Sequence, residues 1–248
     1  MMRNWNKNMK KREILEKISG QLIISCQAFE DNPLYGAENT LTMAECARAG
    51  GARALRICWP DQVKKIKEHL DLPVIGINKQ FREGMCLYDD VFITPDYEAA
   101  REMIEAGSDI VALDGTLRNR TAKDLEIMIR RLKTEFPEVP LMADIATIEE
   151  GILCESIGFD ILSTTLSGYT RETMSSSREP DYRLAGELKR RTRCFVNAEG
   201  RIWERAQLVR MMEEKPDSVT IGTSVTNPMA ITQRFLSAFE ECRKAEKE

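Results

Sequence analysis

A lysine and a glutamate stand where two buried strands are expected to end. Lys79 follows the apolar run at residues 74–77, and Glu199 follows the run at residues 194–198. A lysine with the usual pKa of about 10.4 is a poor base at neutral pH, but partial burial and a neighbouring cation, here Arg56, lower that pKa. Two proton-transferring groups that approach one carbon atom from opposite faces can invert a stereocentre. These residue types therefore predict acid–base catalysis of an epimerisation.

Eight short apolar runs, each ending in a polar or glycine-rich cluster, would position these groups. They occupy residues 22–26, 52–57, 74–77, 110–113, 141–143, 161–162, 194–198 and 218–221. Helical patterns fill the gaps, and the repeat is close to the roughly 30 residues of one strand–helix unit in a barrel of about 250 residues. In such barrels the active site lies at the carboxyl ends of the strands. We expect an α/β fold, a (β/α)8 TIM barrel forming one domain over residues 1–248, with an N-terminal arm and helix at residues 1–20.

The main alternative architecture is a doubly wound open sheet. Its first strand is normally followed by a Gly-x-Gly-x-x-Gly turn, but residues 25–28 contain no glycine. Gly51, Gly107 and Gly158 each end a helical pattern shortly before a β-rich run, as expected for a left-handed helix end in repeated strand–helix units. The barrel is therefore favoured. The expected helix N-caps are Asp96 and Thr147.

The ends of the seventh and eighth runs predict a phosphate-binding site. Gly200 and Arg201 follow Glu199, and Gly222 and Thr223 follow the last run. The loops after these two strands form the recurrent phosphate site of TIM barrels. Glycine lets the backbone approach a phosphate, and arginine adds a positively charged side chain that can donate two hydrogen bonds to it. The alternative is that the two glycines merely allow tight turns.

Composition restricts the classes of function. The chain has 36 basic and 40 acidic residues and a formal net charge of −4, so no nucleic-acid-binding face is expected. No apolar run approaches the roughly 18–20 residues of a membrane helix. Residues 14–24 are interrupted by charged and polar residues and do not form a signal-peptide core. A cytoplasmic protein without a membrane partner is expected.

Histidine and cysteine usage argues against most metal sites. The single histidine, His69, lies in a helical pattern at residues 61–70, so neither a Ser-His-Asp triad nor a two-histidine metal site can be assembled. The seven cysteines are scattered without a Cys-x-x-Cys pair, as expected for reduced thiols. Cys26 and Cys58 are interpreted as buried packing residues. We expect no metal, although Asp114 and Asp144 leave a magnesium site open as an alternative.

Two segments are longer than ordinary loops. Residues 166–180 are polar and follow the sixth run, and residues 79–94 follow the third run and include a short apolar stretch at 91–93. Long loops in a compact domain are commonly lids or binding loops. We interpret residues 166–180 as a lid, with surface disorder as the alternative.

The sequence resembles the N-acylmannosamine-6-phosphate 2-epimerase family, whose members interconvert N-acetylmannosamine 6-phosphate and N-acetylglucosamine 6-phosphate in bacterial sialic acid catabolism. The resemblance covers residues from about 20 to 240. Its most specific strings are Ser-Thr-Thr-Leu-Ser-Gly-Tyr-Thr at residues 163–170 and Ala-Glu-Gly-Arg-Ile at 198–202. Further matches lie at residues 24–28, 72–79, 110–114 and 141–145.

The resemblance implies a barrel of the ribulose-phosphate-binding type, no cofactor, and a phosphorylated N-acyl amino sugar as the substrate. By position, Lys79 matches the catalytic lysine, which takes the proton from C2 of the open-chain sugar, and Glu199 matches the second acid–base group. Gln27, Arg56 and Asp144 match residues lining the sugar, and we expect Asp114 and Thr165 beside them. The matching phosphate-binding residues are Gly200, Arg201, Gly222 and Thr223.

Departures from the family pattern cluster around the expected sugar site. After Arg56 the usual Ala-Asn is replaced, and residues 57–60 read Ile-Cys-Trp-Pro. Lys79 is followed by an unusual segment at residues 80–87. Asn197 replaces a usually apolar residue and shares strand parity with the catalytic glutamate, which predicts that it faces the barrel interior. These changes concern the identity of the acyl amino sugar more than the reaction.

Two other functions remain open from the sequence. Lys79 could form a Schiff base with a sugar carbonyl in a lyase, or the chain could be a phosphosugar sensor that binds without turnover. A purely structural role for Lys79, in an ion pair with Glu199 or Asp144, is a further alternative. The sequence leaves a homodimer possible.

Overall fold

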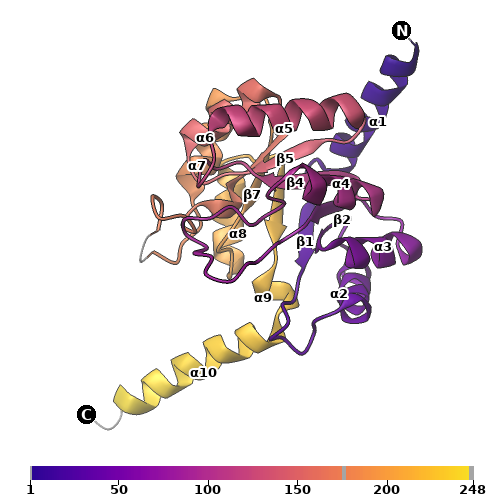
Figure 1. Ribbon diagram of the computed structural model, residues 1–248. Helices are drawn as coiled ribbons and strands as arrows, with labels where there is room; N and C mark the ends of the chain where they lie inside the picture. The colour runs from indigo at the N-terminus through magenta and orange to yellow at the C-terminus, as the bar shows by residue number, and fades with distance from the viewer. Residues whose placement is uncertain (1, 175–176, 246–248) are drawn as a thin grey trace.

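A computed structural model describes residues 2–174 and 177–245. Within these residues, eight parallel strands close into a barrel in chain order, with β8 returning to β1 (Figure 1). The strands are β1 (Leu22–Cys26), β2 (Ala54–Cys58), β3 (Val74–Ile77), β4 (Ile110–Asp114), β5 (Leu141–Asp144), β6 (Ile161–Ser163), β7 (Phe195–Glu199) and β8 (Ser218–Ile221). The predicted single-domain (β/α)8 barrel is confirmed, and the open doubly wound sheet is wrong.

Helices alternate with the strands and cover the outside of the barrel. They are α1 (Met2–Ile18), α2 (Ala37–Ala49), α3 (Pro60–His69), α4 (Tyr97–Glu105), α5 (Ala122–Glu135), α6 (Ile148–Ile157), α7 (Tyr182–Arg191), α8 (Arg205–Glu213), α9 (Thr223–Thr226) and α10 (Pro228–Ala245), with a 3-10 turn, η1 (Thr164–Leu166), after β6. The predicted N-caps are confirmed, since the side chains of Asp96 and Thr147 each accept a backbone hydrogen bond at a helix start. The predicted left-handed glycines are confirmed too, with φ values of 103°, 100° and 104° at Gly51, Gly107 and Gly158.

Several strands run one residue further than the sequence predicts. β4, β5 and β7 include Asp114, Asp144 and Glu199, which were expected just after the strand ends, and β2 begins at Ala54 instead of residue 52. The added residues are polar and would not be counted in an apolar run. Because they remain in the strands, the alternation of the sheet fixes the direction of their side chains.

Apolar side chains fill the barrel interior at the end opposite the carboxyl ends of the strands. Ile23, Ile75 and Ile110 point inward from three strands, and Ile14 and Ile18 of α1 pack against this interior cluster. The predicted N-terminal helix therefore closes the end of the barrel opposite the polar strand ends. The chemistry is confined to the other end, where the interior side chains become polar.

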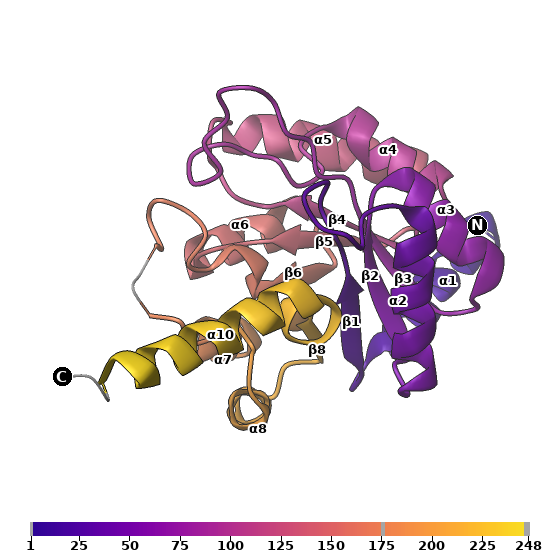
Figure 2. The same ribbon diagram turned by 90° about the horizontal axis from the view of Figure 1, so that it is seen from below.

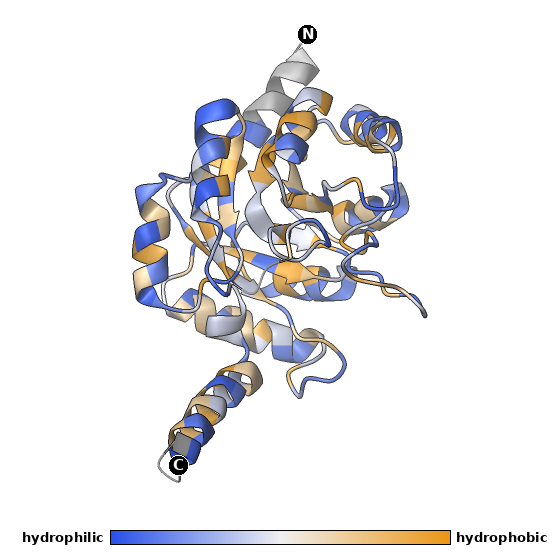
Figure 3. Ribbon diagram, turned by 90° about the vertical axis from the view of Figure 1, so that its left-hand side faces the viewer, coloured by the Kyte–Doolittle hydropathy of each residue, from blue (hydrophilic) through white to orange (hydrophobic). Residues whose placement is uncertain are grey.

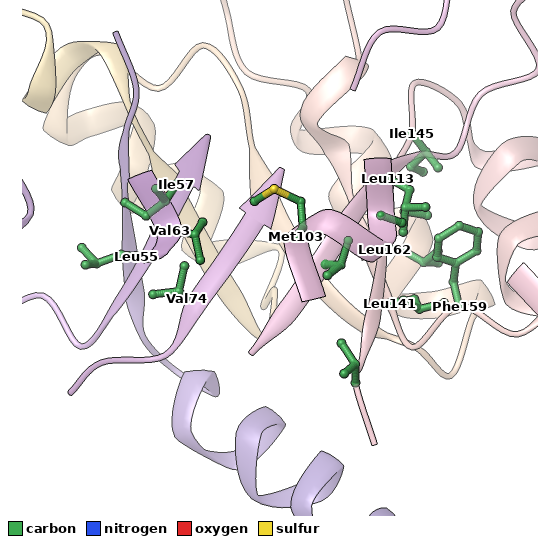
Figure 4. Close-up of a cluster of buried hydrophobic side chains, with 14 of the residues drawn as sticks. Leu55, Ile57, Val63, Val74, Met103, Leu113, Leu141, Ile145, Phe159 and Leu162 are labelled. Atoms are coloured by element: carbon green, nitrogen blue, oxygen red, sulfur yellow. The ribbon is translucent and has the colours of Figure 1, made fainter. Parts of the chain in front are cut away.

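A second apolar cluster lies between the strands and the surrounding helices. Figure 4 shows part of it, in which Leu55 and Val74 from neighbouring strands lie near Val63 of α3, and Leu141 and Leu162 lie near Phe159. In Figure 3, hydrophilic residues face outward on the helices and hydrophobic residues face the barrel. Apolar packing on both faces of the strands, inside the barrel and against the helices, fixes the positions of the strand ends.

The remaining sequence predictions of the fold concern single residues. His69 is the last residue of α3, and its Nδ1 lies 2.9 Å from the Lys65 carbonyl at the surface, as predicted for a solvated helix residue. Cys26 and Cys58 are fully buried, and their predicted packing role is confirmed. Burial raises the pKa of the Cys26 thiol to about 12 and that of Cys58 to about 11.

The C-terminal helix leaves the barrel. α10 projects away from the strands in both Figure 1 and Figure 2. Phe235, Leu236 and Phe239 on this helix are 72%, 54% and 59% exposed. Across the described residues, none of the helices has both the length and the apolar character needed to cross a membrane.

Candidate active site

A cavity of about 290 Å³ opens at the carboxyl ends of the strands. Eight of the predicted site residues line it: Gln27, Lys79, Thr165, Glu199, Gly200, Arg201, Gly222 and Thr223. Arg56 and Asp144 lie beneath this lining, where they contact Glu199 or Thr165. The structure thus brings together ten residues that are scattered between positions 27 and 223.

Arg56 joins two carboxylates beneath the cavity. Its Nη2 donates to Asp144 Oδ2 at 2.5 Å, and its Nη1 donates to Asp144 Oδ1 at 3.1 Å and to Glu199 Oε2 at 2.6 Å. Thr165 Oγ1 donates to Asp144 Oδ1 at 2.8 Å and lies 3.2 Å from Glu199 Oε2. Arg56 is 1% exposed and Asp144 is 0% exposed. This network holds the Glu199 carboxylate at the cavity floor.

Burial and charge set the protonation of this network. Burial raises the pKa of Glu199, Arg56 opposes the rise, and Asp144 adds to it. Burial disfavours the charge of Arg56, but Asp144 and Glu199 hold its pKa above the ordinary value. Arg56 therefore stays a cation, and Glu199 is a carboxylate whose proton affinity is higher than usual. Such a group can exchange a proton nearer to neutral pH.

Lys79 enters the cavity from the end of β3. Its backbone bridges to Ile93 in the following loop, and its carbonyl accepts a hydrogen bond from Trp59 Nε1 at 2.9 Å. Its Nζ lies 4.8 Å from the centroid of the Phe29 ring. The predicted alternative, a structural ion pair of Lys79 with Glu199 or Asp144, does not form, because both carboxylates pair with Arg56.

The surroundings of Lys79 favour its unprotonated amine. Burial is the main cause that lowers its pKa, Cys58 opposes this shift, and the charge of Arg56 adds to it. A lower pKa leaves more of the amine unprotonated near neutral pH. β3 and β7 lie on opposite sides of the closed barrel, so Lys79 and Glu199 face the cavity from opposite walls. Lys79 and Glu199 thus lie on facing walls as predicted, and their roles in proton transfer stay a prediction.

Asn197 lies one layer below Glu199 and faces the interior, as its parity predicts. Its Nδ2 donates to Ser163 Oγ at 2.8 Å, and its Oδ1 accepts from Ser218 at 2.9 Å and from Thr220 at 3.0 Å. The side chain is 0% exposed. These partners satisfy a buried amide that would otherwise be costly. Asn197 thus supports the floor of the site rather than lining it.

The loops after β7 and β8 form one wall of the cavity. Gly200 and Arg201 both have positive φ values, 113° and 59°, which turn the chain back over the strand end. The Arg201 guanidinium packs on Gly168, where a Cβ atom would lie 2.5 Å from Nη1. The close approach therefore requires glycine at position 168. It brings the segment predicted as a lid against the predicted phosphate loop.

The predicted lid also contacts the other long loop. Arg171 Nε donates to Asp89 Oδ1 at 2.6 Å, and the Arg171 amide donates to the Tyr88 carbonyl at 3.1 Å. Tyr169 from the same segment lines the cavity. Residues 175 and 176 of the predicted lid lie outside the described residues. Closure by this segment stays a prediction.

Asp114 lies apart from the other predicted site residues. Its carboxylate accepts hydrogen bonds from Arg118 Nη2 at 2.5 Å and from Thr116 Oγ1 at 2.6 Å, and Arg120 Nη2 lies 3.7 Å from Oδ1. It is absent from the described residues that line the cavity. No group of three or more potential metal ligands occurs in the described part of the chain. The arginines take the places that a magnesium ion would need at Asp114.

Some lining residues were not predicted. Ser25, Tyr169, Trp203 and Asn227 line the cavity. Ser25 could have been found by alternation, because it lies two residues before Gln27 and its Oγ accepts from Gln27 Nε2 at 2.6 Å. Trp203 and Asn227 follow the strands at irregular distances, so no periodic signal points to them. In the described residues Gln27 Oε1 and Arg201 Nε are buried without a hydrogen-bond partner, which leaves an acceptor and a donor for a ligand.

Known proteins resemble this chain over most of its length. A family described as "Putative N-acetylmannosamine-6-phosphate epimerase" matches residues 40–241. A protein of Caldanaerobacter subterraneus named "Putative N-acetylmannosamine-6-phosphate 2-epimerase" is 40% identical over 232 residues, which is 93% of this chain and 96% of that protein. A protein of the same name from Listeria monocytogenes is 36% identical over 233 residues, 93% of this chain and 97% of its own length.

Solved structures agree with the sequence comparison. The N-acetylmannosamine-6-phosphate 2-epimerase from Clostridium perfringens superposes with a TM-score of 0.83 and 34% identity, covering 91% of this chain and 96% of that one. The thiamine phosphate pyrophosphorylase from Pyrococcus furiosus, at 14% identity and a TM-score of 0.56, covers 87% of this chain and 91% of its own and shares the fold alone. The family model matches most of the chain, and the relatives are 36–40% identical over nearly their whole length, so the family is shown. The chain belongs to the N-acetylmannosamine-6-phosphate epimerase family.

Proposed function

We propose that this protein is an isomerase that inverts C2 of N-acetylmannosamine 6-phosphate to give N-acetylglucosamine 6-phosphate. Membership of the epimerase family supports the reaction. The observation that carries the proposal is the half-buried Lys79, which faces the cavity with a lowered pKa and opposite Glu199. We place this activity in amino sugar and sialic acid catabolism, the context that the sequence resemblance implies.

The chemistry follows from the acidity of C2. In the open-chain sugar, C2 lies next to the C1 aldehyde, so removal of its proton gives an enolate whose charge spreads to the carbonyl oxygen. Lys79 takes this proton as the unprotonated amine. Return of a proton to the opposite face inverts C2, and we assign this step to Glu199. Arg56 holds the Glu199 carboxylate through a 2.6 Å hydrogen bond and adds positive charge beneath the enolate.

The phosphate is assigned to the loops after β7 and β8. Gly200, Arg201, Gly222 and Thr223 line one side of the cavity, and the short helix α9 follows Gly222 directly. This is the usual place for phosphate in a TIM barrel. Gln27 Oε1 is available to accept from a sugar hydroxyl. No step of the reaction requires a metal or a cofactor.

Solvent exchange at C2 tests the reaction and separates the roles of the two groups. Wild-type protein is incubated with N-acetylmannosamine 6-phosphate in deuterated water, and C2 is followed by proton NMR. We expect conversion to the gluco epimer with deuterium at C2. Conversion with the C2 hydrogen fully retained would contradict proton transfer through solvent-exchanging groups.

Two variants sharpen this experiment. Lys79→Ala should lower kcat by at least roughly 10²–10⁴-fold while leaving phosphosugar binding largely intact. Glu199→Gln should still exchange the C2 proton of the substrate but form little epimer. If exchange and epimerisation fall together in Glu199→Gln, Lys79 serves both faces and Glu199 only holds the site.

Trapping of substrate on Lys79 by borohydride would instead favour a Schiff-base lyase, and binding without any turnover would favour a sensor.

We also propose that the protein is a homodimer that exchanges α10. In a (β/α)8 barrel the helix after β8 normally covers β8 and β1, but α10 projects outward (Figure 2). The uncovered face is an apolar groove of about 620 Å³ beside α2, lined in part by Leu22, Met43 and Val225. Leu22 and Val225 are 40% and 52% exposed. The apolar face of α10 from a second copy would cover this groove.

Light scattering after size exclusion tests this assembly. Wild-type protein should elute with the mass of two chains, and Phe235→Glu combined with Phe239→Glu should elute as a monomer. Glu240→Lys on the same exposed helix serves as the control for a change of charge alone. A monomeric wild type would contradict the exchange.

A cytoplasmic location also stays a proposal, supported by seven cysteines that are all free.

A further inference from the structure

Four aromatic rings gather at the mouth of the barrel beside Lys79. Phe29 lies 5.8 Å from Trp59 and 5.7 Å from Phe81 between ring centroids, and Tyr35 lies 5.8 Å from Trp59, all in edge-to-face arrangements. Phe29, Tyr35 and Phe81 are 39%, 42% and 48% exposed. We call these four residues the aromatic cleft. Clustered exposed rings are unusual on a protein surface and mark ligand sites.

The aromatic cleft adjoins the candidate active site through Lys79. It lines a cavity of about 590 Å³ together with Glu30, Asp31 and Lys79. Lys79 also lines the cavity that holds the predicted catalytic and phosphate residues. Its Nζ lies 4.8 Å from the centre of the Phe29 ring. A ligand atom at the Lys79 amine is therefore within reach of the cleft.

Trp59 is held in this place against its backbone preference. Its φ and ψ are 67° and 145°, a region that residues other than glycine rarely adopt. The indole Nε1 donates to the Lys79 carbonyl at 2.9 Å, and its ring meets both Phe29 and Tyr35. The fold retains the strained conformation that holds the indole against the Lys79 backbone. Such strain is characteristic of functional sites.

The cleft is built from the segments in which this sequence departs from the family pattern. Trp59 belongs to residues 57–60 and Phe81 to residues 80–87. The structure brings these two segments together around Phe29. Phe92 stacks on the far side of Phe81 at 5.6 Å and supports it. The two departures therefore form one feature.

We propose that the aromatic cleft receives the N-acyl group of the substrate and selects an uncharged, aliphatic acyl chain longer than acetyl. The inference rests on the proposed function, which puts C2 at Lys79 and the phosphate at the β7 and β8 loops. Because Lys79 lines both the active-site cavity and the aromatic cleft, the acylamino group on C2 lies next to the cleft. Aromatic faces favour methylene groups, and the exposed carboxylates of Glu30 and Asp31 at the rim disfavour an acyl group that carries a carboxylate.

Substrates that differ only in the acyl group test this proposal. The kcat/KM of wild-type protein is compared for the N-acetyl, N-propanoyl, N-butanoyl and N-succinyl forms of mannosamine 6-phosphate. We expect the propanoyl and butanoyl forms to exceed the acetyl form, by roughly tenfold for one methylene, the lower end of the range for an apolar pocket. The succinyl form should be the poorest substrate. Equal kcat/KM for the acetyl, propanoyl and butanoyl forms, or a steady fall from acetyl to butanoyl, would overturn the proposal.

Variants assign any preference to the cleft. Phe81→Ala should lower kcat/KM for the butanoyl form about tenfold more than for the acetyl form, and Phe81→Leu should lie between this variant and wild type. Leu87→Ala, a change at a residue 46% exposed in the same segment, should leave all ratios unchanged. An equal loss for every acyl group in Phe81→Ala would overturn the acyl assignment. Absence of turnover for all substrates in wild-type protein would instead refute the epimerase, and the inference with it.

Discussion

Replacing Arg56 by methionine removes the cation that holds Asp144 and Glu199 together beneath the active site. Arg56 and Asp144 are almost completely buried, and breaking such a pair by removing one partner costs about 3–5 kcal/mol. In a domain of this size each kcal/mol changes Tm by about 2–4 °C. Arg56→Met should therefore lower Tm by roughly 6–20 °C. Asp144→Asn should lose less, because Arg56 keeps its 2.6 Å contact with Glu199.

The dependence of this loss on pH identifies its cause. In Arg56→Met, the pKa of Glu199, which burial already raises, loses the main influence that lowers it. A carboxyl group with a raised folded-state pKa contributes stability below its unfolded pKa of about 4.3 and loses that contribution as pH rises through the folded value. The Tm deficit relative to wild type should therefore be larger at about pH 8 than at about pH 5.

Differential scanning calorimetry at the two pH values measures both effects. The assay compares wild type, Arg56→Met and Asp144→Asn, with Arg101→Met as a control, because Arg101 forms only exposed ion pairs on α4. A deficit in Arg56→Met that is no larger than that of the control would refute the central role of Arg56. A deficit that is independent of pH would show that lost packing, and not an unpaired carboxylate, causes the destabilisation.

Other perturbations test different parts of the structure. Lys79→Met should raise the free energy of unfolding in urea at neutral pH, because burial lowers the pKa of Lys79, and the difference should vanish above the unfolded pKa of about 10.4; an unchanged value at neutral pH would contradict the buried amine. Gly76→Ala should cost about 1–3 kcal/mol, since the new Cβ would overlap Ser108 Oγ and lie 2.8 Å from Met103 Cε; equal stability in urea would contradict it. Extended EDTA treatment should leave activity unchanged in a coupled assay, whereas loss that magnesium restores would reveal a metal at Asp114.

The elements that position the site could be predicted because their signals are periodic. Each strand is a short apolar run, and the parity within it decides which side chains enter the barrel. Arg56, Glu199 and Asn197 face the interior for this reason, and the register pairs Asp144 with Ser163 and Ser163 with Asn197 across neighbouring strands. Local chemistry also sufficed for the helix starts, because a capping side chain bonds to an amide only three residues away.

The partners of the site residues could not be predicted in the same way. Asp144 and Glu199 pair with Arg56 across 88 and 143 residues of sequence, and only the closed barrel brings them together. Asp114 sits at a correct strand end, but Arg118 and Arg120 in its own loop turn back onto it. A strand-end position therefore predicts proximity to the mouth of the barrel. It does not predict whether residues of a neighbouring loop will form ion pairs with the side chain and keep it out of the cavity.

The pairing of Arg56 with both carboxylates is consistent with the proposed role of Lys79 as a base. Had Glu199 or Asp144 paired with Lys79, the attraction would have stabilised the ammonium form and raised its pKa. Both carboxylates instead bond to Arg56, a guanidinium that stays charged at any physiological pH. The Lys79 amine lies against the Phe29 ring, in buried surroundings that favour its neutral form more than water does. The same arrangement keeps the Glu199 carboxylate fixed in the facing wall. One buried arginine thus holds both carboxylates, while Lys79 lines the same cavity without an ion pair to either of them.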